Sequence, residues 1–241
     1  MSRGDRRRRI TGEFFLIVLG VVAALGVDRW VQGIDESRTE RDYLERLASD
    51  VRANVGVFDY MLRDWEAALA ASSDLLAAIE NPSSRPSHSG LLAAVARAGA
   101  TNTRLAQDAS FQDLAATGNL KVIKDSSLRL ALVNYFGQQI LAGRPRLDRL
   151  DLRFRTFSRE YLPLEWAESW RELCPAEVPT FECTTDNPPS TDLIWNALTQ
   201  DSTMPRILTS RRNEAARSVI IIRTWLSQSE EMLSTLEEAL S

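Results

Sequence analysis

An apolar stretch over residues 10–31 restricts the folds open to this chain. A basic tail, residues 1–9, precedes the stretch, and a long polar remainder follows it. A helix rises about 1.5 Å per residue, so this one would reach about 33 Å, close to the ~30 Å hydrocarbon core of a bilayer. We therefore predict one transmembrane helix over 10–31. The residues expected to anchor it are Phe14, Phe15, Leu16, Ile17, Val18, Leu19, Gly20, Ala24 and Trp30.

The basic tail predicts the orientation of this helix, because an excess of arginine marks the cytoplasmic side of a membrane span. The residues that carry this signal are Arg6, Arg7, Arg8 and Arg9. They predict a cytoplasmic tail over 1–9, a location in the cell inner membrane and a periplasmic bulk over 32–241. A cleaved secretory signal is the alternative, because Glu13 and Asp28 shorten the uncharged run to the length of a signal peptide.

The two cysteines of the chain, Cys174 and Cys183, lie in one proline-rich segment. In an oxidising compartment such a pair forms a disulfide, which closes a short loop and contributes roughly 2–3 kcal/mol. A zinc site needs more ligands, and the single histidine, His88, lies in a different loop. A redox-active pair usually has closer C-x-x-C spacing. We predict a structural disulfide.

Apolar residues recur at steps of three and four over three long segments, a spacing typical of bundle helices. The segments are 44–80, 126–162 and 204–240, each about 55 Å long as a helix. Pro82 ends the first segment, and Pro145 is expected to kink the second. We predict an all-α fold: one N-terminal transmembrane helix followed by an extracytoplasmic antiparallel bundle of three long helices plus short helices.

The order of these helices predicts how the bundle stands on the membrane. The first long helix leads away from the bilayer, and residues 89–124 form short helices at the far end. The second long helix then returns, and the third leads away again. This order places the disulfide loop, residues 163–203, close to the membrane.

Several motifs together resemble a known family. They are EFFLIVLG over 13–20, Asp28-x-Trp30, SFQDLAATGNLKVI over 110–123 and SLRLALVNYF over 127–136. This set is similar to an uncharacterised family of single-pass bacterial membrane proteins. Its members pair an E-F-x-L-I-V-x-G anchor with F-x-x-L-x-x-x-G-x-L-x-x-I and L-R-x-x-L-x-x-Y-Y segments. Phe136 stands where that pattern has its second tyrosine. The resemblance covers about half of the chain and implies the single-pass architecture, but the family is a domain of unknown function and implies no chemistry.

The motif over 110–123 is typical of a helical corner. Gly118 can adopt the left-handed conformation that ends a helix, and Asp125 or Ser126 is suited to cap the next helix. The apolar residues expected to pack the corner are Phe111, Leu114, Leu120 and Ile123. A ligand pocket at the corner is the alternative interpretation.

The sequence carries no recognisable catalytic set. It contains no glycine-rich phosphate loop and no H-E-x-x-H motif, and His88 between serines and a proline is typical of an exposed linker. Neither a metal nor a cofactor site is predicted. The net charge of −4 gives no indication of nucleic-acid binding. We therefore predict a protein that is not an enzyme.

Two groups of residues are candidates for contact with a partner. The first is the arginines Arg153, Arg155 and Arg159, for which a solvated helix with local ion pairs is the alternative. The second is Trp166 and Trp170, which share one side of a helical turn and have the residue type common in binding hot spots. A small core pinned by the disulfide is the alternative for the tryptophans.

These features predict an accessory or scaffold subunit that binds and stabilises a larger membrane protein complex, whether respiratory, photosynthetic or of the envelope. Its expected partners are other membrane protein subunits and the lipid bilayer, with no nucleic acid and no small-molecule substrate identified. A periplasmic ligand-sensing bundle that acts through a partner protein is the alternative function.

Overall fold

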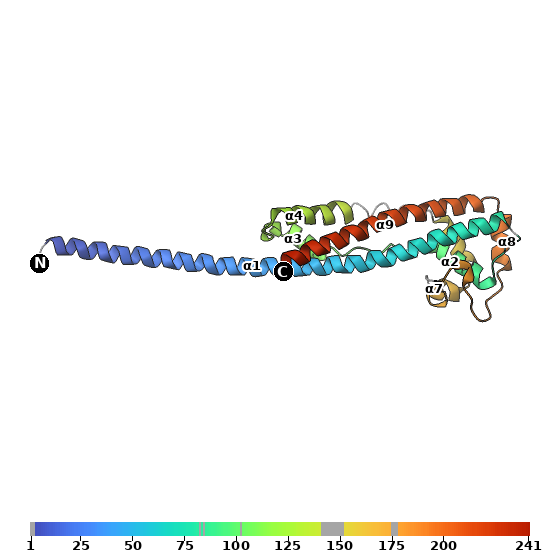
Figure 1. Ribbon diagram of the computed structural model, residues 1–241, viewed down its shortest axis with the longest axis horizontal. Coiled ribbons are helices and arrows are strands. Elements are labelled where there is room, and N and C mark those ends of the chain that lie inside the picture. Colours follow the sequence, from blue (N-terminus) through green and yellow to red (C-terminus); the bar gives the residue numbers. More distant parts are fainter. Residues whose placement is uncertain (1–2, 82, 84, 102, 141–151, 175–177) are drawn as a thin grey trace.

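A computed structural model describes residues 3–81, 83, 85–101, 103–140, 152–174 and 178–241, with side chains from residue 36 onward except at 138–140. The described residues form helices and no strand, which confirms the all-α fold. These described residues form two long helices and two groups of short ones (Figure 1).

Helix α1 covers Arg3–Glu80 without a break and is about 117 Å long at the usual helical rise. It ends next to Pro82, as predicted, because a residue before proline is disfavoured in the helical conformation. The end toward Arg3 projects beyond the rest of the molecule (Figure 1). From residue 44 onward one face of α1 is buried at Leu47, Val51 and Phe58, which confirms the predicted amphipathic face.

Helix α9, Met204–Leu240, lies antiparallel along α1 and confirms the predicted third long helix. Two ion pairs fix the register: Arg52 with Glu237 at 2.7 Å, and Arg223 with Glu66 at 2.8 Å. The two paired residues on each helix are fourteen positions apart, and their order along α9 is the reverse of that along α1. The C-terminus therefore lies beside the middle of α1 (Figure 1).

The chain after α1 does not stay at the far end, which corrects the predicted topology. Helix α2, His88–Gly99, packs near Glu80, but the following segment returns along α1 in an extended conformation. Contacts with α1 mark its path: Arg104 over the ring of Tyr60, Asn54 with Gln107, and Asp50 with Ser110. Helix α3, Ala109–Ala116, and the 3₁₀ turn η2, Asn119–Val122, thus lie beside the residues of α1 near position 45.

The second predicted long helix begins where expected and runs in the opposite direction to the prediction. It consists of α4, Ser126–Leu132, followed by the π-helix η3, Val133–Ile140. Lys124 contacts Glu40, and Tyr135 contacts Asn54. This segment is therefore parallel to residues 40–54 of α1. Residues 141–151, with the kink predicted at Pro145, lie outside the described residues.

The bundle has two hydrophobic cores, one after the other along α1. The proximal lobe joins α3, η2, α4 and η3 to residues 44–68 of α1 and 215–236 of α9. The distal lobe joins α2 and buried residues between 154 and 208 to residues 71–78 of α1. The elements that the distal lobe adds are α6 (Arg153–Tyr161), α7 (Leu164–Leu173), η4 (Thr180–Glu182) and α8 (Asp192–Gln200).

The disulfide region, residues 163–203, belongs to this distal lobe and not to the end of the bundle next to residues 10–31. The prediction of a membrane-proximal loop is therefore wrong. The prediction failed because the return segment over 100–108 adds one reversal of the chain, which the helix periodicity does not reveal.

The predicted transmembrane helix, 10–31, belongs to the part of α1 whose side chains are not described, and so do its anchor residues and the arginines of the tail. Among the residues that are described, none of the helices is both long and apolar enough to cross a membrane.

Candidate functional site

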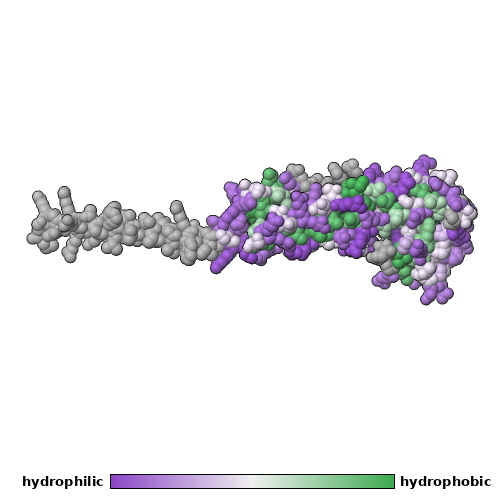
Figure 2. All heavy atoms as spheres, in the orientation of Figure 1, coloured by the Kyte–Doolittle hydropathy of each residue, from purple (hydrophilic) through white to green (hydrophobic). Residues whose placement is uncertain are grey.

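Helix α6 separates two hollows on the distal lobe. A cleft lies on its side toward α2 and α7, and a groove lies on its side toward α8 and the start of α9. Figure 2 shows hydrophobic residues that reach the surface of this lobe among mostly hydrophilic neighbours. These two hollows are the candidate binding sites of the described chain.

The cleft has a volume of about 200 Å³ and is lined by arginines, which we call the arginine cleft. Arg155 and Arg159 enter from α6, and Arg171 enters from α7. Small residues of α2, Ala96 and Gly99, form its opposite wall. The cleft exists because these small side chains leave space beside three long cationic ones.

The contact between α2 and α6 positions the two arginines. Gly99 ends α2 directly against Ser158: a Cβ atom at Gly99 would lie 2.4 Å from the Cβ of Ser158, which is a clash. Only glycine allows this close approach. Because Ser158 lies three residues after Arg155 and one before Arg159, its contact with Gly99 turns both arginines toward α2.

The charges of the cleft are only partly compensated. Arg171 forms an ion pair of 2.7 Å with Asp64 of α1 and lies over the ring of Trp170. Within the described part of the chain, no carboxylate forms an ion pair with Arg155 or Arg159. Burial lowers the pKa of the Arg155 guanidinium, and the neighbouring charge of Arg159 lowers it further. The cleft is therefore a region of excess positive charge.

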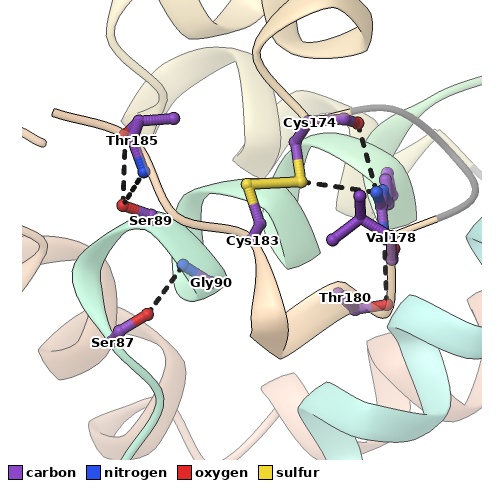
Figure 3. Close-up of a disulfide and its surroundings, with 9 residues drawn as sticks. Ser87, Ser89, Gly90, Cys174, Val178, Thr180, Cys183 and Thr185 are labelled. Atoms are coloured by element: carbon purple, nitrogen blue, oxygen red, sulfur yellow. Dashed lines mark hydrogen bonds between the residues drawn. A yellow bond between two sulfur atoms is a disulfide. The ribbon is translucent and has the colours of Figure 1, made fainter.

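The disulfide Cys174–Cys183 lies in the distal core, which confirms the predicted pairing. Figure 3 shows its surroundings, where Ser89 meets Thr185. The side chain of Arg97 donates hydrogen bonds to the backbone oxygens of Cys174 and Val178, at 3.1 and 2.8 Å. These bonds attach the disulfide loop to α2, which also forms one wall of the arginine cleft.

The groove on the other side of α6 is larger, about 660 Å³, and has an apolar floor; we call it the apolar groove. Phe157 and Tyr161 of α6 stack on each other there, and Met204 and Ile207 of α9 continue the floor. Leu193 of α8 also lines it and is 79% exposed. Charged residues at the rim, Arg153, Glu160 and Asp201, carry both signs.

The structure separates the predicted contact residues into two kinds. Trp166 and Trp170 are 2% and 5% exposed and pack in the distal core, so the alternative interpretation of a small core holds and the predicted partner contact is corrected. Arg153 and Arg159 are exposed and Arg155 is half-buried, and they line the two hollows. The sequence reasoning missed Gly99, Ser158 and Leu193. Only the run of small residues before Gly99 gives any signal of a close helix contact.

The other predicted features are structural in the described chain. Gly118 has a φ of 69° and begins η2 in the left-handed conformation, and Asp125 caps α4. Phe111, Leu114 and Ile123 are buried in the proximal core, which agrees with the helical corner.

His88 is exposed, and its ring nitrogen Nδ1 lies 2.8 Å from the hydroxyl of Thr191. Among the described residues, no group of three histidine, cysteine, aspartate or glutamate side chains is arranged to hold a metal ion.

Comparison with known proteins adds no relative: no family model matches the chain, and no curated protein or solved structure matches it either. The family resemblance of the anchor and corner motifs stays a prediction.

Proposed function

We propose that this chain is a non-enzymatic, membrane-anchored accessory or scaffold subunit that stabilises a larger membrane protein complex. The observation that carries the proposal is the unbroken course of α1 from Arg3 to Glu80. One helix thereby joins the apolar residues 10–31 to both lobes of the bundle. If residues 10–31 span the membrane, the continuous helix fixes the distance of the distal lobe from the bilayer. The end of α1 in this lobe lies about 66 Å of helix beyond residue 36.

The apolar groove is the surface that we assign to the partner. Leu193 is 79% exposed, so most of its apolar side chain lies outside the core. The apolar floor with charges of both signs at the rim suits an amphipathic segment of a partner subunit, whose apolar face would cover Leu193 and Tyr161.

The proposal is tested by extracting the full chain from its own membranes in mild detergent and identifying the proteins that remain bound. We expect an assembly of fixed stoichiometry that contains other membrane subunits. Leu193→Glu should release these subunits, because it places a charge in the apolar groove. Ile220→Glu is the matched control, since Ile220 is an exposed apolar residue of α9 outside the groove, 65% exposed. A chain that is extracted alone or only as a homodimer would contradict the scaffold function.

The arginine cleft favours a second function, a periplasmic bundle that senses a ligand and acts through a partner protein. A group of arginines whose charge is only partly compensated is a feature that a scaffold does not require. The two functions differ in their dependence on a ligand. A sensor exchanges its partner when the cleft is filled, whereas a scaffold retains the same partner with the cleft filled or empty.

A further inference from the structure

We propose that the arginine cleft binds a small oxyanion with two negative charges, either a phosphate group or a dicarboxylate. This inference goes beyond the scaffold function and does not depend on it. The first argument is the balance of charges in the cleft. Three guanidinium groups, from Arg155, Arg159 and Arg171, face the cleft, and one carboxylate, Asp64, pairs with one of them. Two positive charges remain, and a dianion neutralises both.

The size of the cleft limits the ligand. A volume of about 200 Å³ corresponds to roughly six or seven water molecules at about 30 Å³ each. This space accommodates a phosphate group or a short dicarboxylate, together with some water. Ser158 and Thr101 also line it and add hydroxyl groups to the guanidinium donors. Arginine suits such ligands because its planar fork donates two parallel hydrogen bonds to an oxyanion.

The end of α2 does not oppose an anion in the cleft. A helix C-terminus carries partial negative charge on its free carbonyl groups, which would normally repel a negative ligand. Here the buried side chain of Arg211 donates hydrogen bonds to the backbone oxygens of Ala98 and Ala100. The carbonyl groups of Ala98 and Ala100 at this end of α2 are therefore already bound to a guanidinium group.

The test is a calorimetric titration of the full chain in nanodiscs of neutral lipid at low ionic strength. The probes are inorganic phosphate and succinate, with chloride at matched ionic strength as the monovalent control. We expect saturable binding of at least one dianion and none of chloride, with weaker binding as salt is added. Tighter binding of phosphate would assign the ligand to the phosphate class, and tighter binding of succinate would assign it to the dicarboxylates.

Charge variants locate the bound anion. Arg155→Gln and Arg159→Gln should each weaken binding by roughly tenfold, because each removes a charge-assisted hydrogen bond. Arg217→Gln makes the same change of charge on an exposed part of α9 outside the cleft and should bind as the unchanged protein does. Far-UV circular dichroism checks that each variant is folded.

A further variant keeps the charge and fills the space. Ala167 lines the cleft and is exposed, so Ala167→Trp should block binding without unfolding α7. Absence of saturable binding of either dianion up to ~10 mM, a concentration that detects even millimolar affinity, would overturn the proposal. Unchanged affinity in a variant without both Arg155 and Arg159 would overturn it as well.

Discussion

Arg211 is a buried side chain that contacts both lobes. It is 2% exposed and lies over the ring of Trp65, which belongs to the proximal core. The same guanidinium pairs with Glu214 at 2.7 Å and binds the backbone oxygens at the end of α2, in the distal lobe. A buried cation with this many partners fixes where α2 ends, and α2 in turn forms one wall of the arginine cleft.

We predict that Arg211→Ala destabilises the protein by about 3–5 kcal/mol, because it breaks a buried ion pair by removing one partner. Urea unfolding followed by circular dichroism measures this loss. Arg217→Ala, on an exposed position of the same helix, should change the stability by at most about 0.5 kcal/mol. Equal effects of the two substitutions would show that Arg211 has no special role.

Tyr135 is a second buried polar residue with an identifiable role. Its hydroxyl lies 2.8 Å from the hydroxyl of Ser229 on α9 and accepts a hydrogen bond from Asn54 on α1. Asn54 also holds the return segment through the backbone of Gln107. This network joins η3, α9, α1 and the return segment at one point of the proximal lobe.

The network predicts a pH dependence at the alkaline end. Burial raises the pKa of Tyr135 above its usual value of 10.0, so the folded state retains this proton more strongly than the unfolded state. The stabilisation is complete below pH 10 and is lost as the pH rises through the higher pKa of the folded state. Thermal unfolding between pH 9 and pH 11 should show this loss.

Tyr135→Phe is the matching variant, because it removes the ionisable hydroxyl and keeps the ring. It should cost about 1 kcal/mol at neutral pH, since Ser229 and Asn54 keep other backbone partners. Its stability should also fall less than that of the unchanged protein above pH 10. The same alkaline loss in both proteins would assign the effect to other groups.

At the scale of elements, the disulfide acts on the distal lobe alone. Cys174 and Cys183 are nine residues apart and both buried in the distal core. We predict that Cys174→Ser with Cys183→Ser lowers the stability of this lobe by roughly 2–3 kcal/mol, because the cross-link restricts the unfolded chain. Hydrogen exchange should rise in α2 and α7 and stay unchanged in α3 and α4 of the proximal lobe. A uniform rise along the chain would instead show that the two lobes unfold together.

Helices with long apolar periodicity could be predicted from the sequence, and elements placed by tertiary contacts could not. The ends of α1 and α9 follow from proline and from the three-to-four spacing, which are local properties. The return segment over 100–108 is polar and short, and its course depends on Asn54 and Tyr60, far away in the sequence. Missing this one segment reversed the expected direction of α4 and the position of the disulfide region.

The candidate site shows the same division. Arg155 and Arg159 could be recognised from their clustering, but the cleft between them and α2 requires the contact of Gly99 with Ser158. That contact joins residues almost sixty positions apart. Trp166 and Trp170 are of a residue type common in binding surfaces, but they are buried in the core. Residue type alone does not distinguish a binding surface from a core.

At the scale of the whole molecule, the two cores follow each other along α1, so the distance of each lobe from residues 10–31 is fixed by the helix (Figure 1). Lys124, three residues after Lys121, contacts Glu40 on α1, whereas Leu193 lies in the lobe formed around residues 71–78. The two positions are separated by about 50 Å along the helix. With the proposed membrane anchor, the arginine cleft and the apolar groove both lie well outside the bilayer.

This arrangement predicts different energy transfer from two labelled positions to acceptor lipids in a nanodisc. Both Lys121→Cys and Leu193→Cys replace exposed residues, and the native cysteines are joined in the disulfide and do not take up the label. A donor at residue 121 should transfer efficiently, and a donor at residue 193 should transfer little, because residue 193 lies about 50 Å farther along α1 from the proposed span. Equal transfer from both positions would mean that the bundle lies flat on the membrane. Stronger transfer from residue 193 would contradict a membrane anchor at residues 10–31, because α1 places the distal lobe farther from these residues than residue 121.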